Sequence, residues 1–181
     1  CKVNHLVIDK TGTLTEGKIS LSNTQVYGSL NQEQVLAIAA SLETHANHPI
    51  ASAFQPYFNP CVTAENVENH IGFGLSGTIN GKSCKIGSYS FIGSQLAKHA
   101  PQTVYLSIDD LLVASFTYTD PIRESSKPFL EALSAKGIKT TLLTGDNALN
   151  AQLVAKQLHL DEVVSEVDPA GKLNYLNGLP K

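Results

Sequence analysis

Methionine is absent from the 181 residues, and cysteine occurs only three times. Because a natural protein begins with methionine, we expect this chain to be a piece of a longer one. The cysteines, Cys1, Cys61 and Cys84, form no C-x-x-C pair and no zinc-type cluster, and their odd number favours a reducing compartment. No apolar run approaches the roughly 18–20 residues of a membrane span, and no signal peptide opens the sequence.

An excess of basic residues is also missing, since 13 basic residues stand against 16 acidic ones and give a formal net charge of -3. A nucleic-acid-binding protein usually carries a basic excess, so we expect no nucleic-acid partner. Apolar residues make up 42% of the chain, which is too many for a disordered one. The length allows one ordinary domain or two small ones.

Both ends of the chain carry strand, loop and helix patterns. The apolar run Leu6-Val7-Ile8 leads into a polar stretch over 9–17, which predicts a buried parallel strand ending in a functional loop. The other end, after Asp120-Pro121, predicts a helix over 125–136, a strand over 138–143, a helix over 148–158, a strand over 162–164 and a helix over 171–176.

The middle of the chain has a different pattern. It predicts a strand over 19–27, a helix over 32–43, a short helix near Pro49, strands over 67–71, 75–79, 83–86, 104–108 and 111–118, and a short helix over 89–98. Asn80-Gly81 and Asp109-Asp110 are expected as hairpin turns. We therefore predict an α/β domain made of residues 1–18 and 119–181, interrupted by an α+β domain over 19–118 built on an antiparallel sheet.

The first chemical constellation is Asp9-Lys10-Thr11-Gly12-Thr13-Leu14-Thr15. Open α/β sheets bind ligands at the carboxyl ends of their strands, where Asp9 is expected. A carboxylate there can act as a nucleophile and form an acyl phosphate, while the threonines and the loop amides can bind an anion. An isolated D-x-T-G is more often a loop cap, because Asp and Thr are common turn residues.

The whole seven-residue string resembles the phosphorylation signature of the P-type ATPases in every position. The resemblance implies a HAD-like (Rossmannoid) phosphorylation domain with an inserted nucleotide-binding domain, ATP and Mg²⁺ as cofactors, and Asp9 as the phosphorylated residue. It places Lys10 and Thr11 in the catalytic site, and makes Asp9 and Thr11 the expected Mg²⁺ ligands.

Two segments of the middle region resemble nucleotide-binding motifs of the heavy-metal subclass. Glu43 and His48-Pro49 match its E…HP pattern, although Ala46 and Asn47 replace the usual Ser and Glu. A surface histidine is the ordinary interpretation of His48 alone. The G-x-G-x-x-G at 72–77 is followed by a strand and a turn, which disfavours a Rossmann site. The resemblance implies nucleotide contacts for Gly72, Gly74 and Gly87, with Ser88 where Asn is usual.

Three further segments extend the resemblance into the last third of the chain. Asp120-Pro121-Ile122-Arg123 is similar to the family's D-P-x-R, which we interpret first as a hinge, with nucleotide contacts for Asp120 and Arg123. Thr144-Gly145-Asp146 matches T-G-D, although Asp146 or Asn147 could equally be a helix N-cap. Lys172 lies near a helix start, where the dipole disfavours a cation; a buried anion partner would explain it, but from the sequence alone a solvent-facing lysine is the more common case. The resemblance, through the family's P-x-x-K, implies that Lys172 neutralises the phosphoryl group.

The family's next landmark, G-D-G-x-x-N-D, is not in the sequence. We therefore expect an incomplete phosphorylation domain that binds ATP and shows poor or no turnover alone. The favoured hypothesis, implied by the resemblance, is that the chain is the cytoplasmic part of an integral membrane pump that transports a heavy metal, with copper as the favoured metal. Its other partners would be the pump's transmembrane and actuator domains, and the transported ion would not bind here. The alternatives are a HAD-fold phosphatase or phosphotransferase, or a non-enzymatic nucleotide-binding module. Thr11, where such hydrolases place a second Asp as general acid/base, disfavours the first alternative.

Overall fold

The computed structural model describes residues 2–93, 99–146, 148–167 and 169–179. Two compact units divide the chain. Unit 1 consists of residues 1–18 and 120–181, and unit 2 of residues 19–119. The sequence-based division lay at 18/19 and 118/119, so each observed boundary falls within one residue of it.

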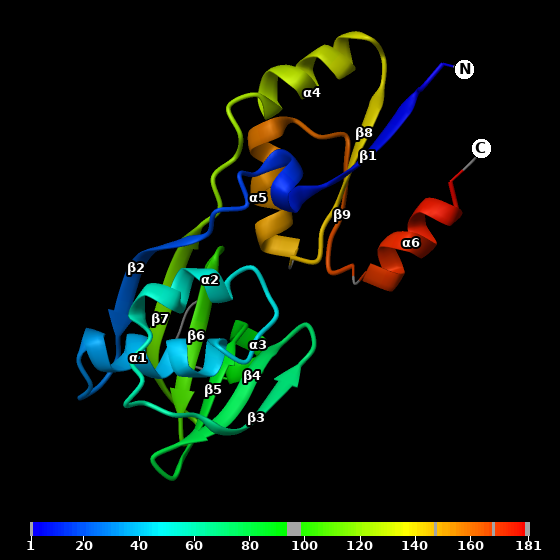
Figure 1. Ribbon diagram of the computed structural model, residues 1–181. Helices are drawn as coiled ribbons and strands as arrows, with labels where there is room; N and C mark the ends of the chain where they lie inside the picture. Colours follow the sequence, from blue (N-terminus) through cyan, green and yellow to red (C-terminus); the bar gives the residue numbers. More distant parts are fainter. Residues whose placement is uncertain (1, 94–98, 147, 168, 180–181) are drawn as a thin grey trace. The chain divides into compact units, whose positions relative to one another are not determined.

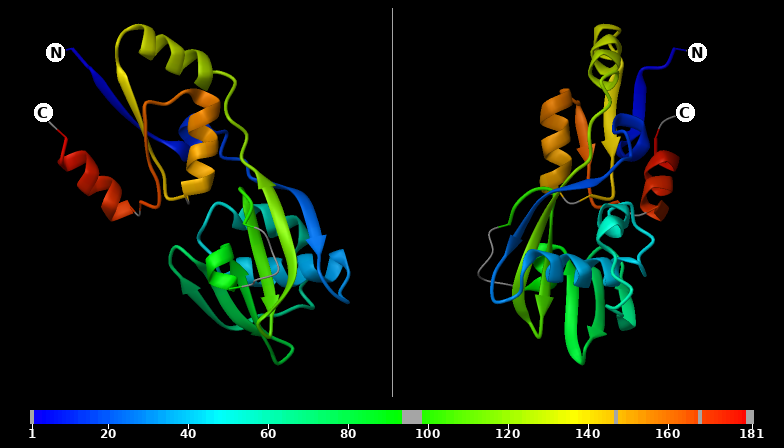
Figure 2. Two further views of the ribbon diagram at one scale, coloured as in Figure 1. Left: turned by 180° about the vertical axis from the view of Figure 1, so that it is seen from behind. Right: turned by 60° about the vertical axis from the view of Figure 1, so that its left-hand side comes forward.

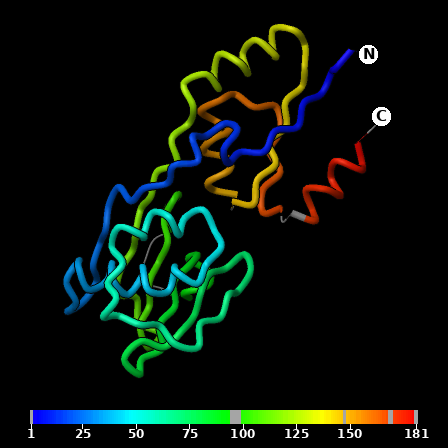
Figure 3. Tube along the Cα trace, viewed as in Figure 1, coloured from blue at the N-terminus to red at the C-terminus, as the bar shows by residue number. Residues whose placement is uncertain are grey.

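Unit 1 is built on a three-stranded parallel sheet in the order β1-β8-β9 (Figure 1). Its strands and helices are β1 (His5–Asp9), α4 (Ser126–Ala135), β8 (Lys139–Leu143), α5 (Ala148–Leu158), β9 (Glu162–Val164) and α6 (Pro169–Asn177). The trace in Figure 3 shows β1 beside β8, although more than 120 residues separate them in the sequence. Figure 2 shows α6 on the side of the sheet away from α5.

The core of unit 1 explains why these segments adopt their structures. Ile8 and Leu142 lie in the sheet, and Leu130 of α4 and Val154 of α5 pack with them. The apolar side chains of α4 and α5 recur at helical spacing, so each helix buries one face. Gly137 follows α4 with φ +71°, which suits the left-handed residue that ends a helix.

Unit 2 is a six-stranded antiparallel sheet in the order β2-β7-β6-β5-β4-β3. Its elements are β2 (Ser20–Val26), α1 (Gln32–Glu43), α2 (Ala51–Phe54), a 3₁₀ turn (Gln55–Tyr57), β3 (Glu65–His70), β4 (Gly74–Ile79), β5 (Lys82–Gly87), α3 (Tyr89–Ile92), β6 (Thr103–Ile108) and β7 (Leu111–Thr119). The helix α1 packs on the sheet through Val35, Ala39 and Leu42, which are fully buried with Ile86 and Leu106 of the sheet.

The predicted fold class, α/β with an inserted α+β domain on an antiparallel sheet, is confirmed. Both predicted hairpin turns are present, and all four of their residues have positive φ: 53° and 74° for Asn80-Gly81, 49° and 63° for Asp109-Asp110. These angles are those of a two-residue turn whose twist matches its flanking strands. No described helix is long and apolar enough to cross a membrane.

Some predicted bounds were wrong. The helix predicted over 89–98 ends at Ile92, because Gly93 adopts φ 66° and closes it; residues 94–98 lie outside the described ones. The strand predicted over 67–71 is β3 at Glu65–His70, where a bulge shifts the pairing and hides the alternation. The short helix predicted to start near Pro49 is present as α2, which begins two residues later at Ala51.

Candidate active site

Asp9 is the last residue of β1, and its parallel neighbour in the register is Leu143, the last residue of β8. Thr144 therefore follows directly at the same edge of the sheet, where the loops of an open α/β fold form ligand sites. The side chain of Asp9 is 54% exposed, so its carboxylate is accessible to an incoming group. Thr144 is buried, and its backbone N–H donates to Val164 while its carbonyl accepts from Val167. This edge of the sheet thus holds the accessible carboxylate of Asp9 and, at the end of the neighbouring strand, the buried Thr144, whose backbone is held by two hydrogen bonds.

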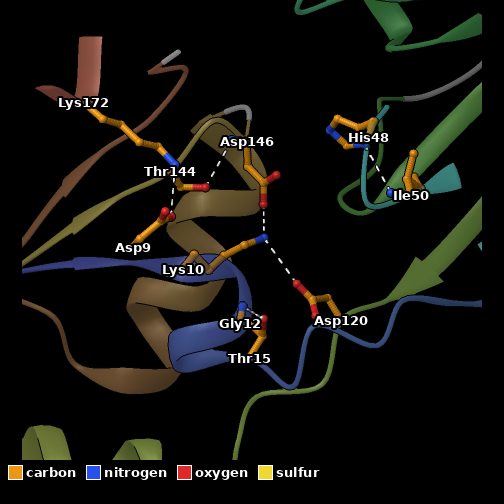
Figure 4. Close-up of polar contacts among 10 residues, drawn as sticks. All are labelled: Asp9, Lys10, Gly12, Thr15, His48, Ile50, Asp120, Thr144, Asp146 and Lys172. Atoms are coloured by element: carbon orange, nitrogen blue, oxygen red, sulfur yellow. Dashed lines mark hydrogen bonds and ion pairs between the residues drawn. The ribbon is translucent and has the colours of Figure 1, made fainter. Parts of the chain in front are cut away.

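Lys172 of α6 provides the cation of this site. Its Nζ donates a hydrogen bond to Asp9 Oδ1 at 3.0 Å (Figure 4). Asp9 is thus the anion partner of Lys172, and both side chains are partly exposed, at 27% and 54%. A lysine within reach of a carboxylate oxygen is also within reach of a phosphoryl group attached to that carboxylate. Asp168, four residues before Lys172, lies outside the described residues.

Lys10 follows Asp9 but lies in a different environment, because its side chain is only 5% exposed. Its ammonium group donates to Asp146 Oδ2 and lies 3.8 Å from Asp120 Oδ2 (Figure 4). A buried charge is tolerated only when it is paired, and here one lysine faces two carboxylates. Three sequence-predicted site residues from three separate segments therefore meet around the buried Lys10 ammonium, in what we call the Lys10 cluster: Lys10, Asp120 and the partly exposed Asp146.

Asp120 Oδ1, the carboxylate oxygen other than the one near Lys10, has no hydrogen-bond partner within the part of the chain that the structure describes. The side chain is 3% exposed, so this oxygen is also removed from bulk water. An unpaired buried carboxylate oxygen is costly, and the attraction of Lys10 offsets that cost only in part. Lys10 Nζ is therefore the charged partner of this buried side chain.

The loop after Asp9 makes a wide turn over Lys10–Leu14, and residues 9–15 are called the aspartate loop below. Thr11 and Gly12 depart from helical geometry, and Gly12 has φ +77°, which glycine adopts without strain. Thr15 is buried, and its hydroxyl accepts the Gly12 N–H at 3.3 Å. Thr11 and Thr13 are exposed, so the loop presents two hydroxyl side chains to solvent near Asp9.

Thr144 and Asp146 shape the second loop of the site. Thr144 Oγ1 accepts the Asp146 N–H at 3.1 Å, and a hydroxyl that accepts one bond still carries a proton to donate. Gly145 lies between them in the sequence. A Cβ added to Gly145 would lie 3.4 Å from Val167 O. The carboxylate of Asp146 binds Lys10, and Asn147, the other predicted helix cap, lies outside the described residues.

Arg123 lies at the aspartate loop as well. Its Nε donates to Thr15 O at 3.0 Å and its Nη2 to Gly12 O at 2.9 Å. Sequence reasoning gave no role to Ser126, whose Oγ donates to Leu14 O at 2.9 Å. A serine one turn from a D-P-x-R segment is an ordinary helix-start residue, so nothing in the sequence signals this contact.

The predicted nucleotide residues of unit 2 belong to two regions. Glu43 ends α1 and is buried, which raises the pKa of its carboxyl to about 7 by loss of solvation. His48 is exposed on the following loop, and its Nδ1 accepts the Ile50 N–H at 3.2 Å (Figure 4). The Ile50 N–H therefore orients the imidazole ring of His48.

Gly74 and Gly87 form the second region, as opposite residues of β4 and β5. A Cβ on Gly74 would lie 2.1 Å from Ile86 O, and one on Gly87 would lie 2.2 Å from Phe73 O. The two backbones therefore approach so closely that only glycine fits at either position. Gly72 lies in the turn before β4 with φ +81° and nothing within 4 Å of its missing side chain.

A groove of about 590 Å³ lies elsewhere on unit 2, between the first turns of α1 and residues 56–60. None of the predicted nucleotide residues lines it, since its walls come from Leu36, Ala37 and the segment Pro56 to Pro60. The nucleotide expectation therefore rests on the two regions above and draws no support from this groove.

A metal site can be tested against the donors present. Within the described ranges, no group of three or more His, Cys, Asp or Glu side chains could hold a metal ion. Mg²⁺, however, is commonly bound by one or two carboxylates together with water and substrate phosphates. Asp9 offers an accessible carboxylate of this kind, because only its Oδ1 binds Lys172 in the contacts above. The residues present therefore fit a Mg²⁺ ion that is shared with a phosphate group.

Comparisons with known proteins give a consistent family context. The sequence profile described as "Hydrolase: haloacid dehalogenase-like hydrolase" matches residues 3–181. The chain is 33% identical over 191 residues to "Copper-transporting ATPase 1" of Rhizobium meliloti (strain 1021), a match that covers 96% of this chain and 23% of that protein. It is 30% identical over 193 residues to "Zinc-transporting ATPase" of Bacillus subtilis (strain 168), covering 98% of this chain and 30% of that one.

Among solved structures, the catalytic domain of the CPx-ATPase CopB-B, from work on conformational changes upon nucleotide binding, matches with a TM-score of 0.75. The identity is 25%, and the match covers 97% of this chain and 66% of that one. The chain thus spans between 23% and 30% of the length of the two curated relatives named above.

Proposed function

This chain belongs to the haloacid dehalogenase-like hydrolase family, and its relatives include ATPases named for copper and zinc transport. We propose that it is the ATP-binding and phosphorylation region of a heavy-metal P-type ATPase. In this proposal ATP binds to unit 2, and its γ-phosphoryl group is transferred to Asp9. The whole protein would then use the aspartyl phosphate to move a metal ion across a membrane, with unit 1 and unit 2 on the cytoplasmic side.

One observation carries the proposal: the accessible carboxylate of Asp9 lies at the sheet edge with Lys172 Nζ 3.0 Å away. Phosphoryl transfer depends on positioning and on stabilising negative charge. Lys172 supplies a positive charge at the position of the transferred group, and the Thr144 hydroxyl supplies a donor at the same edge. Asp9 is the nucleophile in this scheme: its Oδ2 attacks the γ-phosphorus while Lys172 holds Oδ1, the bond from that phosphorus to the β–γ bridging oxygen breaks, and ADP leaves.

The Lys10 cluster has a supporting role in the proposal. Because Lys10 is buried between Asp120 and Asp146, it joins the aspartate loop to the loop of Thr144. We therefore assign Lys10 to holding the two loops together, where the family resemblance alone places it in catalysis. A bound Mg²⁺, held by Asp9 with Thr11 beside it, would neutralise charge on the phosphates.

ATP would be held in unit 2 by Glu43, His48, Gly72, Gly74 and Gly87. Support comes from the exposure of His48, whose ring is oriented by the Ile50 N–H, and from the close backbones at Gly74 and Gly87. A neutral Glu43 can donate as well as accept a hydrogen bond, and burial favours that neutral form. Copper is the favoured cargo, but relatives named for copper and for zinc are both similar to this chain.

The competing function is that of a HAD-fold phosphatase, and Thr11 is the residue that distinguishes the two. Such hydrolases use a second carboxylate two residues after the nucleophile to activate water. Thr11 is exposed and carries a hydroxyl at that position, and the carboxylates of Asp120 and Asp146 are engaged with Lys10. An aspartyl phosphate on Asp9 should therefore hydrolyse slowly, which suits a pump and not a phosphatase.

The test is incubation of the chain with Mg²⁺ and γ-labelled ATP, followed by an acid quench and counting of the protein-bound label. We expect label that is lost on treatment with hydroxylamine, because acyl phosphates react with it. Asp9→Asn should take no label. The control is Glu16→Gln, which changes an exposed carboxylate close to Asp9 in the sequence and should take as much label as the unchanged chain. Label that persists in Asp9→Asn would contradict the proposal, and rapid release of the phosphate would favour the phosphatase.

A further inference from the structure

Arg123 is the only arginine among the 181 residues. Its side chain donates hydrogen bonds to backbone carbonyls. Its guanidinium group donates to Thr15 O at 3.0 Å and to Gly12 O at 2.9 Å, more than 100 residues away in the sequence. The family resemblance implies a nucleotide contact for this residue. The geometry points instead to the aspartate loop as the structure that Arg123 serves.

The segment around Arg123 binds the same loop through its backbone. The Arg123 N–H donates to Leu14 O at 2.8 Å, and the Glu16 N–H donates to Pro121 O at 2.8 Å. Thr15 and Ile122 form an isolated antiparallel bridge, and Ser126 Oγ adds a second donor to Leu14 O. The carbonyls of Gly12, Leu14 and Thr15 are thus all bound by residues 123–126.

These bonds fix more than the carbonyls. A peptide unit is planar, so holding a carbonyl oxygen also fixes the direction of the N–H on the following residue. The Arg123 bond to Gly12 O therefore sets the Thr13 N–H, and the bond to Thr15 O sets the Glu16 N–H. Gly12 has φ +77° and could adopt many other conformations, which makes an external restraint on this turn effective.

We infer that Arg123 is a positioning residue for phosphoryl transfer: it holds the aspartate loop in the conformation that presents Asp9 and the Thr13 N–H to the phosphoryl group. The inference rests on the proposed phosphorylation of Asp9 and assigns Arg123 no contact with the nucleotide. A guanidinium group is planar and donates in a fixed fork, which lets it reach two carbonyls at once; a lysine ammonium lacks that geometry.

The test compares Arg123→Gln and Arg123→Lys with the unchanged chain in two measurements: the dissociation constant of ATP, and the rate constant for labelling Asp9 at saturating ATP. Misplacement of a reacting group by about 1 Å can cost about 100-fold in rate, so we expect a loss of about 10- to 100-fold in Arg123→Gln. The dissociation constant should not change. Arg123→Lys should stay well below the unchanged chain, and Lys136→Gln, which removes an exposed charge at the end of α4, should match it.

Chemical rescue separates positioning from a loss of folding. Free guanidinium should restore labelling to Arg123→Ala, and methylammonium at the same concentration should not, because only guanidinium reproduces the planar fork. Failure of guanidinium to restore any labelling would overturn the inference. A weaker ATP affinity with an unchanged saturated rate would also overturn it, since that result means that Arg123 contacts the nucleotide.

Amide hydrogen exchange tests the same contacts without phosphorylation. In Arg123→Gln, the amides of Thr15 and Glu16 should exchange faster than in the unchanged chain, while that of Leu142 in β8 should keep its rate. Unchanged exchange at Thr15 and Glu16 would overturn the inference whatever the activity. An unchanged chain that takes no label would contradict the proposed function alone, because the exchange measurement still decides whether Arg123 holds the loop.

Discussion

Substitution of Glu43 by glutamine should remove a pH dependence from the stability of unit 2. Glu43 is buried at the end of α1, and loss of solvation raises the pKa of its carboxyl from 4.5 to about 7. The folded protein therefore binds a proton on Glu43 more tightly than the unfolded chain does. Stability is highest when Glu43 is protonated in both states, at low pH, and falls as the pH rises from about 4.5 to about 7.

The size of this effect follows from the two pKa values. A difference of one unit corresponds to about 1.4 kcal/mol, so the full penalty is on the order of 3 kcal/mol above pH 7. Between pH 5.0 and pH 8.5 the free energy of unfolding should fall by about 2.5 kcal/mol through this group alone. Glutamine at position 43 keeps the shape and has no proton to lose, so the stability of Glu43→Gln relative to the unchanged chain should rise over the same range.

Urea unfolding followed by near-ultraviolet circular dichroism of tyrosine would measure this difference. Five of the six tyrosines, Tyr27, Tyr57, Tyr89, Tyr105 and Tyr118, belong to unit 2, so the signal reports mainly on that unit. Glu33→Gln is the matched control, because Glu33 is exposed on the same helix and should show little pH-dependent change. A difference between Glu43→Gln and the unchanged chain that is constant from pH 5.0 to 8.5 would refute the reasoning.

Three further predictions concern the two units. Gly87→Ala should destabilise unit 2 by about 3 kcal/mol or more in urea unfolding, because its Cβ would lie 2.2 Å from Phe73 O; a stable variant would mean that the strands part easily. Lys10→Met should cost unit 1 about 3–5 kcal/mol, measured by amide exchange in β1 and β8, since it leaves Asp120 buried without a cation. Lys139→Met is the control; it breaks an exposed ion pair with Glu162 and should cost only about 0–1 kcal/mol. Equal losses in Lys10→Met and Lys139→Met would contradict a stabilising role for the Lys10 cluster. His48→Ala should weaken ATP binding in calorimetry while the exposed neighbour His45→Ala does not, and equal affinities would remove His48 from the nucleotide site.

Local signals explain why much of the fold could be predicted. Asn80-Gly81 and Asp109-Asp110 are short turns whose residues tolerate positive φ, and they place two hairpins without any tertiary information. The apolar run before Asp9 and the one before Thr144 likewise place two buried strands and the loops that follow them. By contrast, the end of α3 depends on the conformation of one residue, Gly93, which the sequence alone does not fix.

The candidate site was predicted in part, because motifs identify residues but not their contacts. From its place near a helix start, Lys172 is more readily interpreted as a solvent-facing lysine, and the structure pairs it with Asp9. Nothing local indicates that Lys10 is buried between Asp120 and Asp146, or that Arg123 binds the carbonyls of Gly12 and Thr15. These contacts join segments more than 100 residues apart, so only the folded chain brings them together.

The most direct test of the central claim is to locate the phosphoryl group after reaction with ATP. The chain would be incubated with Mg²⁺ and ATP, trapped with hydroxylamine, digested, and analysed by mass spectrometry for an aspartyl hydroxamate. The account predicts the hydroxamate at Asp9, in the peptide that contains the aspartate loop, and its absence when ATP is replaced by a non-hydrolysable analogue. A hydroxamate at another carboxylate, or an unmodified Asp9 in a chain that binds ATP, would contradict it.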